Sequence, residues 1–120
     1  MVEIILENFQ TIIQSIILIK HRFETVHKAD DFILSEEGVI FLDSISMRLQ
    51  VIGELLKKND KLDNKLFQQY PNIEWQQIMR LRDIISHHYE SIDHEIIFDI
   101  CCNHIENLEK AVLEIINTLK

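Results

Sequence analysis

The segment ILENFQTIIQSIILIKHRFETV, residues 5–26, decides the fold class of this chain. Its apolar residues recur in alternating steps of four and three, the spacing that places side chains along one side of an α-helix. They are Ile5, Phe9, Ile12, Ile16, Ile19, Phe23 and Val26. We therefore predict a first helix of about seven turns, with one apolar side that packs inward.

The same spacing predicts a second and a last long helix. The second is expected to begin near Asp31 and to end before Asn59. Its inward side consists of Leu42, Ile45, Leu49, Ile52 and Leu56. The last helix has Ser91 and Asp93 as candidate N-caps, because a side-chain oxygen can accept hydrogen bonds from the first N–H groups of a helix. Its apolar side consists of Phe98, Cys101, Ile105, Leu108, Val112, Ile115 and Leu119.

Pro71 and two glycines complete the helical pattern. A short helix is expected within residues 62–70, since a proline disfavours helical geometry in the residue before it. A fourth helix is predicted over residues 73–89. Gly38 and Gly53 fall inside the second helix, where each costs about 1 kcal/mol relative to alanine. They are either tolerated weak points or positions where another helix or a subunit comes close.

Turn-forming residues are scarce, with two glycines and one proline in 120 residues. Strands joined by tight turns are therefore not expected. Long helices with short connections predict an all-α fold, an antiparallel four-helix bundle with one short extra helix. Residues 1–120 are expected to form a single domain, because the length suits one hydrophobic core.

The charge balance limits the class of partner. The chain has 12 Lys and Arg residues against 20 Asp and Glu residues, which gives a net charge of −8 and a pI near 5.1. This balance opposes diffuse binding to nucleic acid, and no DNA partner is expected. A locally basic cleft is still compatible with it, because salt screens charges over about 10 Å.

Two further features bear on the cellular setting. Cys101 and Cys102 are adjacent in a helical pattern, where neighbouring side chains diverge, so reduced thiols in the core are expected. The apolar run over residues 12–19 is interrupted by Gln14 and Ser15, and it is shorter than the roughly 20 residues of a membrane span. We expect no membrane insertion and a cytoplasmic location.

Polar and apolar residues separate in the stretch RDIISHHY, residues 82–89. On a helix, one broad polar side would carry Arg82, Asp83, Ser86, His87 and Tyr89. The opposite side, expected to pack inward, consists of Ile78, Leu81, Ile84 and Ile85. Arg82 and His87 would lie about 140° apart and flank a groove, an arrangement suited to phosphate chemistry on RNA. A solvated face with an ordinary Asp83–His87 pair fits the same spacing.

These residues resemble the motif of the HEPN domain toxins, in particular the HepT group. That motif is Arg, four residues, His, any residue and Tyr, and Arg82, His87 and Tyr89 match it in full. Asp83 occupies the position after the arginine that the family usually fills with a polar residue. Two more segments are similar to family landmarks and follow in the expected order. They are RLQVIGE, residues 48–54, in the second helix, and PNIEW, residues 71–75, before the motif helix.

The resemblance implies a metal-independent endoribonuclease that acts as a homodimer, needs no cofactor and is the toxin of a type II toxin-antitoxin pair. Attack by the 2'-hydroxyl of RNA needs a base and an acid, and a two-fold axis would supply the second imidazole. We therefore assign three catalytic residues. His87 and its symmetry mate transfer protons, Arg82 stabilises charge on the phosphorane, and Asp83 orients His87.

The resemblance also implies a protein partner, a minimal nucleotidyltransferase antitoxin that can transfer AMP to the motif tyrosine, here Tyr89. A phosphate on Tyr89 would lie beside Arg82 and obstruct the groove. Supporting roles are expected for three residues. Ser86 could add a hydrogen bond, and Arg48 and Glu54 could hold the motif helix or the dimer, with a solvent-exposed ion pair as the alternative.

Two other classes of function fit parts of the sequence. A non-catalytic helical module that binds a nucleotidyltransferase agrees with the acidic charge balance. A carboxylate di-iron bundle would use Glu24 and His27, but such sites need a second copy of this Glu-x-x-His pair, and the sequence has none. His21, His94 and His104 have no ligand spacing, so no metal site is expected.

Overall fold

The computed structural model describes residues 1–87 and 92–120, apart from the side chains of Ser86 and His87. The described residues form helices joined by short loops, and no strand occurs among them. In chain order the elements are α1 Val2–Phe23, the 3₁₀ helix η1 Ala29–Phe32, α2 Glu36–Leu62, α3 Lys65–Gln68, α4 Trp75–Met79, α5 Leu81–His87, α6 His94–Asn103 and α7 Ile105–Leu119. The predicted all-α class is therefore confirmed.

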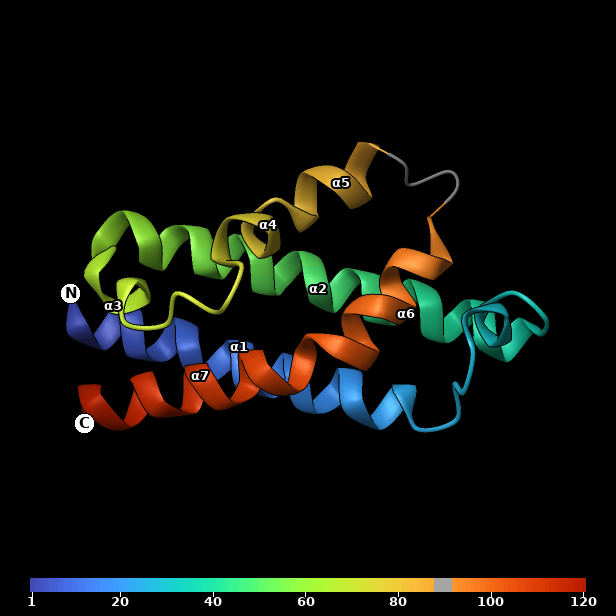
Figure 1. The fold of residues 1–120 in the computed structure, drawn as a ribbon, viewed down its shortest axis with the longest axis horizontal. Coiled ribbons are helices and arrows are strands. Elements are labelled where there is room, and N and C mark those ends of the chain that lie inside the picture. The colour runs from blue at the N-terminus through green and yellow to red at the C-terminus, as the bar shows by residue number, and fades with distance from the viewer. Residues whose placement is uncertain (88–91) are drawn as a thin grey trace.

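The core lies along α1, which packs between α2 and α7 down the long axis of the molecule (Figure 1). The side of α1 that was predicted to pack inward does so, with Phe9, Ile12, Ile16 and Ile19 completely buried. The helices α4 and α5 pack against α2, and α6 packs against η1 and α7. The motif helix is therefore an outer layer supported mainly by α2.

The second helix begins later than predicted. Asp31 belongs to η1, where its carboxylate accepts hydrogen bonds from the N–H groups of His27 at 2.8 Å and Lys28 at 3.2 Å. The bond from His27 contributes most to holding the pKa of Asp31 below its ordinary value. α2 starts only after Ser35, which has extended backbone and accepts from the N–H of Gly38 at 2.9 Å.

The second helix also ends later than predicted, because Asn59 is a buried residue within the helix and not its end. Asn59 is completely buried, and its side-chain nitrogen donates to the carbonyl oxygen of Ile5 at 3.1 Å. Its side-chain oxygen accepts from the amide of Asn8 at 2.9 Å. Both ends of the buried amide are thus satisfied, as a buried polar group requires, and α2 continues to Leu62.

Where the structure describes it, the single helix predicted over residues 73–89 is replaced by two shorter ones, and residues 88 and 89 lie outside the described part of the chain. α4 and α5 meet at Arg80, whose N–H is shared between the carbonyl oxygens of Gln76 at 3.2 Å and Gln77 at 3.1 Å. Such shared bonds tighten the end of a helix. The short helix expected within residues 62–70 is present as α3.

The last predicted helix is also divided. At His104 the backbone angles φ −123° and ψ −30° leave the helical region, and α6 gives way to α7. The start of α6 is as predicted, because the carboxylate of Asp93 accepts from the N–H groups of Glu95 and Ile96. Ser91, the other candidate cap, lies outside the described residues.

α1 is longer and more apolar than residues 12–19 suggested. It has 22 residues with a mean hydropathy of 1.5 in its most apolar window, so by length and composition alone it could cross a membrane. Its inward side packs against α2 and α7, which accounts for an apolar composition in the core helix of a bundle. The expectation of a short apolar run was therefore wrong, while the absence of membrane insertion stays a prediction.

Both cysteines of α6 are free thiols. Cys101 is partly buried and packs against the core, whereas Cys102 is exposed. Burial raises the pKa of Cys101 to about 12, so its thiol stays protonated near neutral pH. The expectation of reduced thiols agrees with this arrangement, but only Cys101 lies at the core.

α4 crosses α2 in close contact at Gly53. A Cβ atom at this position would lie 2.7 Å from the carbonyl oxygen of Ile78 in α4, closer than side-chain atoms pack. Of the two interpretations of this glycine, close approach of another helix is therefore the correct one. The same holds for Gly38, where a Cβ atom would collide with the carbonyl oxygen of Asp31.

We expect Gly53→Ala to destabilise the protein, although alanine is the better helix former by about 1 kcal/mol. The new methyl group must push α4 away from α2, and such overpacking typically costs about 1–3 kcal/mol. Urea unfolding followed by circular dichroism measures the change. Asp43→Ala, at an exposed position of α2, is the control and should change stability by less than about 0.5 kcal/mol. A more stable Gly53→Ala protein would contradict the close approach.

Candidate functional site

The motif helix α5 lies on the outside of α2 (Figure 1). Leu81 and Ile85 are buried and Arg82 and Asp83 are exposed, as predicted. Ile84 was expected to pack inward, but it is 41% exposed. The prediction failed because α5 contacts its support along one narrow stripe, so an isoleucine at the edge of that stripe stays in contact with solvent.

The structure brings Arg82 together with Glu54 of α2. Atom Nη1 of Arg82 lies 3.5 Å from Oε2 of Glu54, and the two side chains are 56% and 38% exposed. Glu54 thus contacts the motif helix through Arg82 as a partly exposed ion pair, the alternative considered for it, and a supporting role for Glu54 stays a prediction. Because both side chains remain in contact with solvent, the guanidinium keeps donors free for a further anion.

The segment before α5 places Arg82 opposite Glu54. Trp75 starts α4, and its indole N–H donates to the carbonyl oxygen of Tyr70 at 3.0 Å. The indole also packs edge-on against Phe67, with ring centroids 4.7 Å apart. These contacts fix where α4 begins, and the missing side chain of Gly53 lets α4 lie directly on α2. The next turn of chain then brings Arg82 to the residue that follows Gly53.

The remaining predicted site residues are described to different extents. Arg48 is a partly buried residue of α2, and the ion pairs seen among the described residues do not include it. Ser86 and His87 belong to α5, so Arg82, Asp83, Ser86 and His87 share one helix as predicted. The side chains of Ser86 and His87, and the whole of Tyr89, lie outside the described residues. The orientation of His87 by Asp83 therefore stays a prediction.

An exposed apolar stripe on α2, along the helix face that carries Glu54, was not predicted from the sequence. On α2, Ile40 is 58% exposed and Met47 is 57% exposed. Ile40, Met47 and Glu54 are spaced by seven residues, which places them on one face of the helix. This heptad spacing on the polar side of α2 is the signal that could have revealed the stripe.

The Arg82–Glu54 contact is expected to contribute little to stability. A double-mutant cycle with Arg82→Ala and Glu54→Ala should give a coupling of about 0.2–1 kcal/mol that disappears at high salt. The comparison is Lys20–Glu109, where Nζ donates to Oε1 at 2.9 Å and Glu109 is only 19% exposed. That pair should couple more strongly. If the coupling energy of Arg82–Glu54 exceeded that of Lys20–Glu109, the Arg82–Glu54 pair would serve to stabilise the fold and not to bind a ligand.

Metal ligands do not gather in the part of the chain that the structure describes. No three His, Cys, Asp or Glu side chains lie close enough there to hold a metal ion. Glu24 and His27, the pair considered for a di-iron site, both lie after the end of α1, in the segment that leads to η1. The predicted independence of a metal ion is tested by measuring activity in the presence of a chelator.

Two curated proteins are similar to this chain over 72 residues, which is 60% of its length. "Putative RNase MJ0127" of Methanocaldococcus jannaschii is 40% identical over 57% of its own length. "Putative RNase TTE0752" of Caldanaerobacter subterraneus subsp. tengcongensis is 31% identical over 62% of its own length. The chain thus matches about three fifths of each of these relatives. No solved structure shows a significant match to the chain.

A family model covers most of the chain and includes the candidate site. The model described as "Ribonuclease HepT-like" matches residues 12–115. This range contains α2 with Glu54, the closely packed helix α4, and α5 with the Arg82-x4-His87 motif. The resemblance seen in the sequence is thereby confirmed, and the chain belongs to the HepT-like ribonuclease family.

Proposed function

We propose that this chain is an endoribonuclease that cleaves RNA without a metal ion and acts as a homodimer. The observation that carries the proposal is the guanidinium of Arg82, which Glu54 contacts at 3.5 Å while it stays 56% exposed. A planar guanidinium oriented in this way suits a phosphate, because its donors match two phosphate oxygens. Membership of the HepT-like family supports the same activity.

In the proposed reaction the 2'-hydroxyl of RNA attacks the adjacent phosphorus, and the bond to the 5'-oxygen breaks. His87 takes the proton of the 2'-hydroxyl, and His87 of the partner subunit gives a proton to the leaving 5'-oxygen. Arg82 stabilises the negative charge of the phosphorane, and Asp83 orients His87. The products carry a 2',3'-cyclic phosphate and a 5'-hydroxyl, so no water molecule is consumed.

Exposed apolar residues support the homodimer. Ile40 and Met47 lie on the face of α2 that carries Glu54, and both are more than half exposed. Clustered apolar residues on a surface mark interaction sites. A two-fold contact through this face would bring both copies of Arg82 to one axis, as a composite catalytic centre requires.

RNA cleavage by the purified protein in EDTA tests the activity. We expect cleavage with 2',3'-cyclic phosphate ends, and we expect none from His87→Ala, because the imidazole carries the proton transfers. Cleavage and growth arrest by His87→Ala would overturn the assignment. The competing function is a non-catalytic module that binds a nucleotidyltransferase, which the net charge of −8 favours. An inactive wild-type protein that forms a stable complex with a nucleotidyltransferase would establish that module instead.

We further propose that the chain is the cytoplasmic toxin of a type II toxin-antitoxin pair. Its antitoxin would be a minimal nucleotidyltransferase that transfers AMP from ATP to the hydroxyl of Tyr89 and releases pyrophosphate. The added phosphate would neutralise Arg82, seven residues away in the sequence, and exclude RNA. Mass spectrometry of the protein co-expressed with the nucleotidyltransferase should show AMP on Tyr89. Neutralisation that leaves Tyr89 unmodified, or that persists in Tyr89→Phe, would contradict the proposal.

A further inference from the structure

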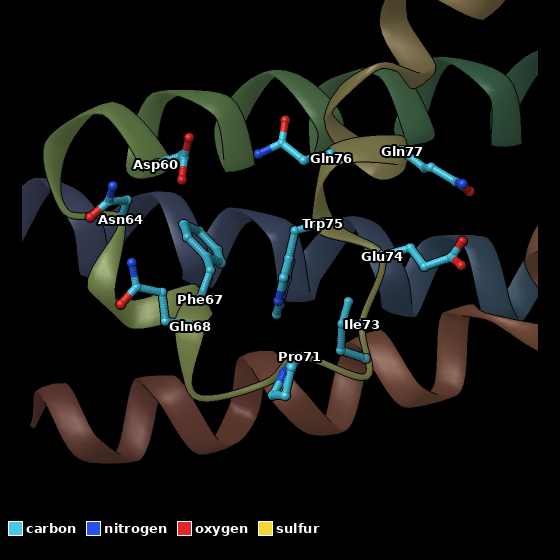
Figure 2. A pocket seen from close by; sticks show the side chains of 10 residues that line it. All are labelled: Asp60, Asn64, Phe67, Gln68, Pro71, Ile73, Glu74, Trp75, Gln76 and Gln77. Carbon is cyan, nitrogen blue, oxygen red and sulfur yellow. The ribbon is translucent and has the colours of Figure 1, made fainter.

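A concave site lies where the end of α2, the short helix α3 and the segment leading into α4 meet (Figure 2). Its volume is about 560 Å³, which is in the range of pockets that bind small ligands. None of its lining residues belongs to the motif helix α5. The pocket is therefore a separate site, and the proposed RNA chemistry does not use it.

The floor of the pocket is an apolar surface that is already fixed in place. Phe67 and Trp75 form it, with ring centroids 4.7 Å apart and an angle of 60° between the rings. The indole N–H of Trp75 donates to the carbonyl oxygen of Tyr70, so the ring cannot turn freely. Both rings are largely buried by the helices beneath them. A ligand would meet their edges without first ordering them.

The rim of the pocket carries negative charge at two separated points. Figure 2 shows Asp60 and Glu74 on opposite sides, with the Phe67 and Trp75 rings between them. The other polar residues of the lining are amides, such as Gln76, and no lysine, arginine or histidine lines the pocket. Phosphate groups are therefore repelled, and positive charges are attracted at both ends of an apolar floor.

We propose that this pocket binds a linear aliphatic diamine or polyamine. Its terminal ammonium groups would pair with Asp60 and Glu74, and its methylene chain would lie across the exposed edges of Phe67 and Trp75. Ammonium hydrogens that do not face a carboxylate can be accepted by amide oxygens of the rim, such as that of Gln76. This binding is independent of RNA cleavage.

Trp75 is the only tryptophan of the chain, so intrinsic fluorescence reports on this pocket. Titration with putrescine and spermidine should give a saturable change, confirmed by calorimetry. 1-Butylamine, with one ammonium group, should bind at least about tenfold more weakly than putrescine, and 1,4-butanediol should not bind. Asp60→Asn/Glu74→Gln should weaken putrescine binding by at least about tenfold. Glu7→Gln/Asp43→Asn removes the same two negative charges from exposed positions elsewhere and should leave binding unchanged.

Several results would overturn the proposal. They are the absence of a saturable signal by both methods, equal responses to putrescine and 1,4-butanediol, and equal losses in the two double variants. Equal losses in the two double variants would mean that binding depends only on the net charge of the protein. Saturable binding of AMP or of an RNA oligonucleotide that requires Asp60 and Glu74 would mark a nucleotide site instead. Because the readout is binding, a failure here leaves the ribonuclease proposal untouched.

Discussion

Replacing Arg82 by alanine is expected to slow RNA cleavage by a factor on the order of 10²–10³, because one oriented donor set for the phosphorane is lost. The rate constant at saturating RNA should fall more than the KM rises, since the charge that Arg82 meets grows in the transition state. Arg82→Lys should recover only part of the rate. A lysine keeps the charge but lacks the planar pair of donors that matches two phosphate oxygens.

The effect of Arg82→Ala on the fold should be small. The side chain is 56% exposed and its partner Glu54 is 38% exposed, so the loss of this pair costs at most about 1 kcal/mol. Arg80→Ala is the matched control, because Arg80 is an exposed arginine two residues earlier in the chain. It should cleave RNA at close to the wild-type rate. Equal losses for the two variants would mean that Arg82 contributes only to the general binding of RNA.

The long helices could be predicted because their signal is local. The period of the apolar residues in α1 is set by helical geometry, and Phe9 and Ile16 are buried as this period requires. The N-cap at Asp93 was predictable for the same reason. Divisions of helices were not predictable, because Arg80 and His104 are residues that fit a helix interior equally well. α4 and α5 each pack on α2, while α6 packs on η1 and α7 on α1, and a sequence pattern does not contain these contacts.

The same limit separates what was and was not predictable in the site. Arg82, Asp83 and His87 lie on one helix, as their spacing indicates, and Gly53 signalled a close approach. The contact between Glu54 and Arg82 joins residues 28 positions apart in the sequence. The direction of α5 decides whether this contact forms, so it was not predictable. The exposure of Ile84 has the same origin, since a helix that packs along one narrow stripe leaves an edge uncovered. Asp60 and Glu74 line the same pocket only because the chain turns at α3.

Met47→Glu is expected to separate the proposed dimer into monomers and to abolish RNA cleavage at low protein concentration. Met47 is 57% exposed, so a glutamate is well solvated in the monomer and the helical content should not change. In a two-fold contact the substitution appears twice, and each copy would bring a charge into an apolar interface. We expect the dissociation constant of the dimer to rise by a factor on the order of 10²–10⁴.

Analytical ultracentrifugation and cleavage assays over a range of protein concentrations measure the two effects together. Ile17→Glu is the control, because Ile17 is 54% exposed on α1, away from the face that carries Glu54. If the catalytic centre is shared between subunits, Met47→Glu should regain activity as its concentration rises, and the activity should follow the dimer fraction. A monomeric Met47→Glu protein that cleaves RNA at the wild-type rate would show that one chain holds a complete centre. The second imidazole would then have to be replaced by another acid from the same chain.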